Sequence, residues 1–250
     1  MNVFPLISEA KKDNRGLLVV LIDPDKITIA ECKTFAQSAE SKGIDIVLVG
    51  GSLLSTNQFG PVIETLKANT KLPVVIFPGS HMQVNQHADA ILFLSLISGR
   101  NPEYLIGNQV IASPMIKAMK LEPISTGYMI IDSGKPTSAS FMSNSLPIPR
   151  NKPDIAAVHA LAAEYLGMKQ VYLEGGSGAE NPVPVEMIQM VSKTTSIPIW
   201  VGGGIKTPED ARIRIEAGAT AIVIGTHFEK NNGHHLVESF AEAIKEKVGK

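Results

Sequence analysis

The stretch Val171-Tyr-Leu-Glu-Gly-Gly-Ser-Gly-Ala-Glu-Asn-Pro182 joins a short apolar run to a glycine-rich break. An apolar run of this kind is typical of a strand buried in a parallel sheet. Glu174 stands where the strand is expected to become a loop. The residues that follow it are small: Gly175, Gly176, Ser177 and Gly178. Because glycine permits positive φ and close backbone approach, the stretch predicts a buried strand that leads into a ligand-binding loop.

The same design recurs twice, at Ile199–Gly204 and at Ile222–Thr226. Three apolar strands would then end in loops of glycine, serine and threonine. Clustered backbone N–H groups bind anions, so the three loops together predict a phosphate cradle. The alternative is that these glycines only form tight turns between strands and helices.

Composition narrows the class of protein. The chain has 250 residues, a formal net charge of −1 and 44% hydrophobic residues, which indicates a globular core and no nucleic-acid partner. Cys32 is the single cysteine, so an intramolecular disulfide and a multi-cysteine zinc site are excluded. The first fifteen or so residues carry several charges and lack a signal-peptide core, and the apolar runs are too short to span a bilayer. We therefore expect a cytoplasmic protein with no integral membrane segment.

Eight apolar runs alternate with helical patterns along the whole chain. Strands are expected at Leu17–Ile22, Ile46–Val49, Val74–Phe77, Ala90–Leu96, Ile124–Ile131, Val171–Leu173, Pro198–Val201 and Ala221–Ile224. This rhythm predicts an α/β protein with one domain over residues 1–250, a single (β/α)8 TIM barrel. A Rossmann domain is less favoured, because the first strand leads into Asp23-Pro-Asp-Lys26 and not into Gly-x-Gly-x-x-Gly.

Two connections depart from a regular barrel. The polar segment between the third and fourth strands has only about twelve residues, so its helix is expected to be reduced or missing. Residues 135–153 are rich in serine, proline and asparagine and are expected to form a long loop or lid.

The carboxyl ends of the strands should hold the binding site, as in other barrels of this kind. Asp23 and Ser52 follow the first two strands and offer only oxygen ligands, which favours Mg²⁺ bridged to substrate phosphates. The alternative is that Asp23 caps the following helix and Ser52 is a turn residue. Asp132 follows the fifth strand and is interpreted as a loop cap rather than as a second acid.

Glu174 is the strongest catalytic candidate. A carboxylate beside a phosphate cradle can accept the proton of a hydroxyl group on a phosphorylated substrate. A structural salt bridge with a lysine or arginine on a neighbouring strand is the alternative interpretation.

At these residues the chain resembles the geranylgeranylglyceryl phosphate synthase family and its relatives, the heptaprenylglyceryl phosphate synthases. The resemblance covers nearly the whole chain, in family order. It lies in Leu21-Ile-Asp-Pro-Asp-Lys26, Val49-Gly-Gly-Ser52, Tyr172-Leu-Glu-Gly-Gly-Ser-Gly178, Val201-Gly-Gly-Gly-Ile205 and Ile224-Gly-Thr226. One departure is Leu21, where some relatives have lysine.

The resemblance implies a Mg²⁺-dependent prenyltransferase and a homo-oligomer. Its substrates would be sn-glycerol 1-phosphate and a polyprenyl diphosphate, with geranylgeranyl diphosphate expected, and it would release diphosphate. Asp23 and Ser52 would hold the metal, and Glu174 would be catalytic. The residues implied to bind sn-glycerol 1-phosphate are Tyr172, Leu173, Glu174, Gly175, Gly176, Ser177, Gly178, Gly203, Gly204, Gly225 and Thr226.

The prenyl tail needs an apolar groove near the mouth of the barrel. The set considered for it is Tyr104, Leu105, Ile106, Met115 and Met119, although its spacing is equally typical of a helix core. Two rival functions stay open at this point. One is a phosphosugar isomerase or cyclase on the same barrel, and the other is a non-catalytic barrel that binds a phosphate ligand.

Overall fold

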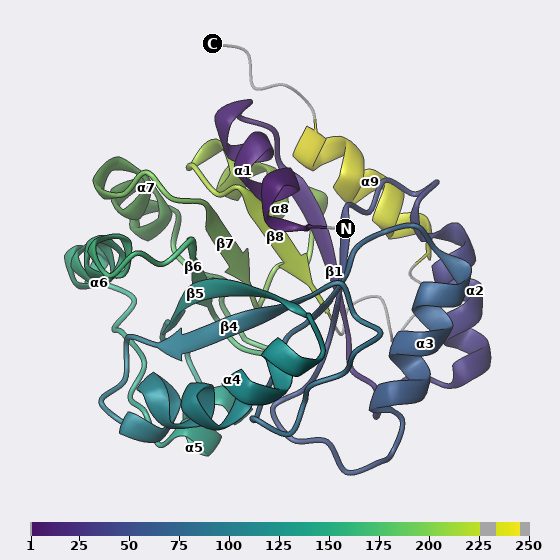
Figure 1. Cartoon of the computed structure of the whole chain (residues 1–250). Coiled ribbons are helices and arrows are strands. Elements are labelled where there is room, and N and C mark those ends of the chain that lie inside the picture. Colours follow the sequence, from purple (N-terminus) through teal and green to yellow (C-terminus); the bar gives the residue numbers. More distant parts are fainter. Residues whose placement is uncertain (1, 226–233, 246–250) are drawn as a thin grey trace.

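The computed structural model describes residues 2–225 and 234–245, and its eight strands form a closed barrel. Every strand pairs in parallel with the next along the chain, and the eighth pairs with the first (Figure 1). The strands are β1 (Leu17–Ile22), β2 (Ile46–Val49), β3 (Val74–Ile76), β4 (Ala90–Leu96), β5 (Glu122–Ile130), β6 (Gln170–Glu174), β7 (Ile199–Gly202) and β8 (Ala221–Ile224). The predicted fold class is confirmed.

Helices surround the barrel along its sides and at its two ends. They are α1 (Phe4–Lys12), α2 (Ile29–Ala39), α3 (Phe59–Asn69), α4 (Asn108–Ala118), α5 (Ser138–Ser143), α6 (Pro153–Tyr165), α7 (Val185–Thr194), α8 (Pro208–Glu216) and α9 (His234–Lys245). A π-helical turn, Glu103–Gly107, runs directly into α4. The start of α2 shows how local sequence sets a boundary. The Thr28 hydroxyl accepts the N–H of Glu31, and the Glu31 carboxylate accepts the N–H of Thr28, which is a capping box.

Alternating side chains divide the core in two. On β1, Leu17 points into the barrel and Leu18 points toward the helices, because successive side chains leave a strand on opposite faces. The same alternation places Tyr172 in the inner core and Leu173 in the outer one. Glu174, two residues after Tyr172, therefore shares the inner side at the carboxyl end of β6.

Helix α1 closes the amino-terminal end of the barrel, and the sequence patterns did not predict it. Val3 and Ile7 pack into the inner core with Leu17 at the start of β1. The Glu122 carboxylate, at the start of β5, accepts the backbone N–H groups of Val3 and Phe4. Because α1 covers this end, the barrel can open to a ligand at its other end, where the carboxyl ends of the strands lie.

The two irregular connections differ from each other. Residues 77–89, which the structure describes throughout, contain no helix, as expected for the segment after β3. Residues 135–153 are not a simple loop, because they contain the short helix α5, and Ile148 forms a bridge with Ile131 at the end of β5. Among the described helices, none is long and apolar enough to cross a membrane.

Candidate active site

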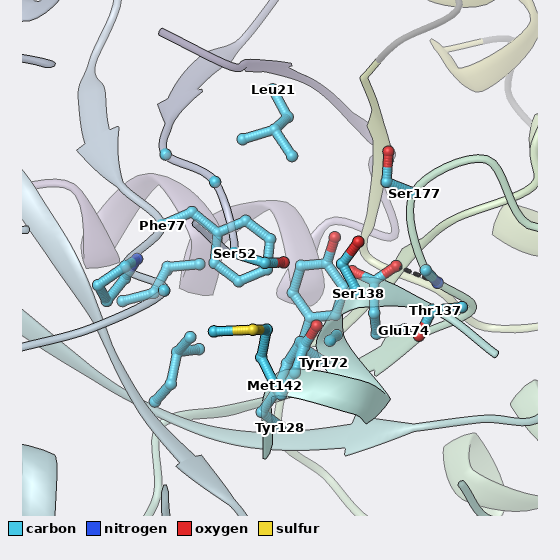
Figure 2. Close-up of a pocket in the computed structure, with 18 of the residues that line it drawn as sticks. Leu21, Ser52, Phe77, Tyr128, Thr137, Ser138, Met142, Tyr172, Glu174 and Ser177 are labelled. Carbon is cyan, nitrogen blue, oxygen red and sulfur yellow. Dashed lines mark hydrogen bonds between the residues drawn. The ribbon is translucent and has the colours of Figure 1, made fainter. Parts of the chain in front are cut away.

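A cavity of about 970 Å³ occupies the carboxyl-terminal mouth of the barrel (Figure 2). Most of the predicted site residues line it together, although they come from five different strand ends. They are Asp23, Ser52, Tyr172, Glu174, Gly176, Ser177, Gly178, Gly203, Gly204 and Gly225. Thr226 lies outside the described residues.

Two predicted residues of the β6 segment do not line this cavity. The Leu173 side chain is fully buried among the outer-core residues, on the helix side of β6. The Gly175 N–H donates to the carbonyl of Gly202 at 2.9 Å, which extends the pairing of β6 with β7. The alternation of side chains along a strand was the signal that separates Leu173 from its two neighbours.

Asp132 also stays outside the cavity lining. Its Oδ1 accepts the N–H of Gly134 at 3.0 Å, and its side chain is exposed. This is the loop-capping geometry that was expected for it.

Glu174 is buried, with 7% of its surface exposed, although no ion pair among the described residues includes it. Its Oε1 accepts the N–H of Gly176 at 2.5 Å, drawn as a dashed line in Figure 2. The hydroxyls of Tyr172 and Tyr128 also donate to the carboxylate. Burial raises the pKa of Glu174, and the three hydrogen bonds offset only part of that rise. Glu174 is therefore a desolvated carboxylate with an elevated proton affinity. Among the described residues no lysine or arginine forms a salt bridge with it, so the structure does not support the salt-bridge interpretation.

Tyr128 is a site residue that the sequence analysis missed. It lies on β5 directly opposite Tyr172 on β6, and the two ring centroids are 5.5 Å apart. The Phe77 ring stacks on Tyr172 at 5.3 Å and meets the edge of Tyr128 at 5.8 Å. Burial, with Glu174 beside them, raises the pKa of both tyrosines well above the usual value. Both hydroxyls therefore stay protonated and act as hydrogen-bond donors.

The loop after β7 places glycine where no side chain fits. Gly203 and Gly204 have φ of 85° and 73°, a region that other residues enter only with strain. A Cβ on Gly203 would lie 2.5 Å from the Gly176 nitrogen and 2.8 Å from Glu174 Oε1. A Cβ on Gly204 would lie 2.8 Å from the nitrogen of Pro182. Close packing thus accounts for part of the glycine pattern, and it brings the backbone of Gly203 next to Glu174.

Asp23 and Ser52 lie on neighbouring loops and both line the cavity. Asp23 does not cap α2, a role that Thr28 fills; its Oδ1 accepts the N–H of Asp25 at 3.1 Å, and its Oδ2 lies 2.5 Å from Lys26 Nζ. In the part of the chain that the structure describes, no cluster of three or more His, Cys, Asp or Glu residues could hold a metal. One carboxylate and one hydroxyl suit Mg²⁺, which keeps several waters and takes further oxygens from substrate phosphates.

The far side of the cavity is apolar. Of the residues considered for a prenyl groove, only Tyr104 lines it, whereas Ile106 and Met115 are exposed. Ala112 and Ile116 of α4 form the inner face instead. Met115 and Ile116 are consecutive residues, so their side chains leave α4 about 100° apart, and of the two Ile116 faces the cavity.

The sequence profile of the PcrB family matches residues 9–246 of this chain. The chain belongs to this family. It is 46% identical over 225 residues to geranylgeranylglyceryl phosphate synthase of Chitinophaga pinensis, covering 90% of this chain and 88% of the relative. It is 42% identical over 236 residues to the synthase of Korarchaeum cryptofilum, covering 94% and 97% of the two chains.

A solved structure agrees with this assignment to the PcrB family. It is the (S)-3-O-geranylgeranylglyceryl phosphate synthase of Thermoplasma acidophilum in complex with its substrate sn-glycerol-1-phosphate. It is 37% identical to this chain with a TM-score of 0.93, and the match covers 99% of this chain and 100% of that one. The family resemblance found in the sequence is therefore confirmed.

Proposed function

We propose that this protein joins a geranylgeranyl group to the 3-hydroxyl of sn-glycerol 1-phosphate, making an ether and releasing diphosphate. One observation carries the proposal. The buried carboxylate of Glu174 lies between a glycine-rich loop and an aromatic floor, in a cavity with a separate apolar side. The names of the relatives and the ligand of the Thermoplasma acidophilum structure support the same reaction.

The glycine loops would bind the phosphate of sn-glycerol 1-phosphate. The N–H of Gly176 is already engaged by Glu174, so the anion would be met by Gly203, Gly204 and the hydroxyl of Ser177. These groups face the same cavity as Glu174, and consecutive backbone N–H groups form anion-binding concavities. Binding the phosphate there would bring a glycerol hydroxyl to Glu174.

Glu174 would act as the general base. A carboxylate offers about four lone-pair sites, and Gly176, Tyr172 and Tyr128 occupy three of them. The remaining site would accept the proton of the 3-hydroxyl while its oxygen attacks the allylic carbon of the prenyl diphosphate. The new C–O bond forms as the bond from that carbon to the diphosphate oxygen breaks, and diphosphate leaves with the electron pair. A proton affinity raised by burial makes Glu174 a better base near neutral pH.

Asp23 and Ser52 would hold Mg²⁺, and Lys26 would add a second positive charge at the same end of the cavity. When bound, the metal would supply Lewis-acid neutralisation of the charge that develops on the departing diphosphate. The apolar side of the cavity, with Ala112 and Ile116, would hold the prenyl chain and exclude water from the allylic carbon.

We also infer a cytoplasmic homo-oligomer. Large apolar side chains are exposed on α4 and α5, including Val110 at 63%, Ile111 at 51% and Phe141 at 82%. Exposed apolar surface of this kind is often covered by another subunit. Light scattering of the purified protein measures the mass directly, and a monomer would contradict this inference.

The activity is tested by incubating the protein with sn-glycerol 1-phosphate and prenyl diphosphates of several lengths, followed by product mass spectrometry. We expect the geranylgeranyl ether to form with Mg²⁺ and to disappear in excess chelator. Product formed at full rate in chelator would contradict the metal role. Absence of any ether product with Mg²⁺ would contradict the reaction itself.

A further inference from the structure

Ser52 lies on a segment whose position the barrel itself does not set. The last ladder bond before it runs from the Gly50 N–H to the carbonyl of Ile22, at 3.1 Å. Residues 50–58 then continue without helix or strand until α3 begins at Phe59. If Ser52 binds a metal together with Asp23, contacts other than strand pairing must therefore fix the distance between these two residues.

Asp25 provides one set of these contacts. Its carboxylate accepts the N–H and hydroxyl of Ser55 at 2.6 and 2.8 Å, and the N–H and hydroxyl of Thr56 at 3.2 and 2.5 Å. Its own N–H donates to Asp23 Oδ1 at 3.1 Å. One residue of the β1 loop thus orients the Asp23 carboxylate and also holds the segment that carries Ser52.

Gln83 provides a second set from the other side. Only 6% of its surface is exposed, and it lies in the short connection between β3 and β4. Its Nε2 donates to the carbonyl of Gly51 at 2.9 Å, and its Oε1 accepts the N–H of Gly79 at 3.0 Å. Gly79 packs so closely that a Cβ there would lie 2.9 Å from the Ser52 Cα. The missing helix after β3 leaves room for this contact.

We propose that Asp25 and Gln83 are positioning residues that hold Ser52 beside Asp23, in the arrangement needed to bind a magnesium diphosphate. This inference rests on the metal role assigned to Asp23 and Ser52 in the proposed function. Neither side chain needs to touch the metal, because each acts through the loop that carries Ser52. Outer partners of metal ligands typically change metal affinity or activity about 10–100-fold when they are replaced.

The carboxylate of Asp25 cannot be replaced by an amide without loss. Four donors converge on its two oxygens, whereas asparagine offers one acceptor oxygen and turns an NH₂ group toward N–H donors.

The matched experiment compares Asp25→Asn with Glu31→Gln. Glu31 is also a carboxylate that follows β1, but it caps α2 through Thr28, and no hydrogen bond among the described residues joins it to residues 50–58. In Asp25→Asn we expect the Mg²⁺ concentration for half-maximal activity to rise about tenfold or more. The KM for sn-glycerol 1-phosphate should change less than about twofold, because the glycine loops are untouched. Glu31→Gln should leave both values unchanged.

Calorimetry gives a readout that does not depend on turnover. Inorganic diphosphate is titrated into each protein with and without Mg²⁺, and the Mg²⁺-dependent part of its binding should weaken in Asp25→Asn. Thr56→Val, which removes one hydroxyl donor and keeps the shape, should show a smaller loss in the same direction and remains informative if Asp25→Asn does not fold. Gln83→Met should also weaken Mg²⁺-dependent binding.

The outcomes separate this inference from the proposed function. If the variants fold and bind magnesium diphosphate as tightly as the wild-type protein, the positioning role alone is wrong. A rise in the KM for sn-glycerol 1-phosphate with unchanged Mg²⁺ dependence would overturn it as well. If the wild-type protein is active without Mg²⁺ and its binding of diphosphate does not depend on Mg²⁺, the proposed metal site is wrong. The positioning role of Asp25 and Gln83 is then wrong as well.

Discussion

Glu174 and Asp25 are two carboxylates at the same mouth of the barrel, and their pKa values shift in opposite directions. Three donors reach Glu174 and four reach Asp25, so both are well hydrogen-bonded. Glu174 is buried among aromatic rings, and the cost of desolvation outweighs its hydrogen bonds and raises its pKa. Asp25 remains in contact with solvent, and its hydrogen bonds lower its pKa to about 2. Burial therefore decides which carboxylate can act as a base and which serves as a fixed anionic anchor.

The largest effect is expected at Glu174. Glu174→Gln keeps the shape and one acceptor oxygen but removes the base, so kcat should fall about 10²–10⁴-fold. The affinity for sn-glycerol 1-phosphate should change much less, because the glycine loops stay in place. Steady-state kinetics and a substrate titration on one preparation measure both quantities. A kcat within about twofold of the unchanged enzyme would remove Glu174 from the mechanism.

A smaller effect is expected when one donor to Glu174 is removed. Tyr128→Phe deletes a hydroxyl that favours the ionised carboxylate, so the pKa of Glu174 should rise further. The base must be ionised, and the acidic limb of the kcat–pH profile should therefore move to higher pH. A hydrogen bond to a charged group contributes about 1.5–3 kcal/mol, which corresponds to a shift of about one to two pH units.

Tyr104→Phe is the control for this measurement. Tyr104 lines the same cavity, but its hydroxyl donates to the carbonyl of Met142 and not to Glu174. The acidic limb of the kcat–pH profile of Tyr104→Phe should stay at the pH at which the wild-type enzyme has it. If Tyr128→Phe lowers kcat equally at every pH, Tyr128 contributes packing and not control of the Glu174 proton.

The smallest effect is expected in thermal stability. Ionisation of Glu174 and ionisation of Asp25 should change the stability of the fold in opposite directions. The pKa of Glu174 is raised in the folded state, so its ionisation destabilises the fold as pH rises through that pKa. Glu174→Gln should therefore melt at or above the temperature of the unchanged protein at pH 7–8, and the gap should close toward pH 4. Asp25 has a lowered pKa, so it stabilises the fold above about pH 4, and that contribution is lost toward pH 2.

Asp25→Asn should accordingly melt slightly below the unchanged protein at pH 7, with the difference fading in acid. Solvent exposure of Asp25 keeps this effect small. Thermal melts of the two variants across pH 3–8 measure both trends. A lower melting temperature for Glu174→Gln at pH 8 would mean that its carboxylate stabilises the fold, as in a structural salt bridge.

Helix α1 and the loop after β6 show which parts of the fold a local sequence pattern can predict and which it cannot. Strand β6 and its glycine-rich end were predicted because apolar runs and glycines act through neighbours a few residues away. Helix α1 was missed, since it is stabilised by burying Val3 and Ile7 in the floor of the barrel and by the contact of Glu122 with its first residues. A pattern of nine residues does not contain those partners.

The sequence by itself determined the eight strands with helices after most of them, the family resemblance, and the placement of Glu174 beside glycine-rich loops. Local periodicity suffices for the strands and helices, because it follows from the geometry of single elements. The motifs between Leu21 and Thr226 carry the family resemblance. Only the tertiary structure decided that Leu173 faces outward, that Tyr128 donates to Glu174, and that Asp25 holds the segment carrying Ser52. Burial and hydrogen-bond partners depend on residues far apart in the chain, and they set the chemistry of each carboxylate.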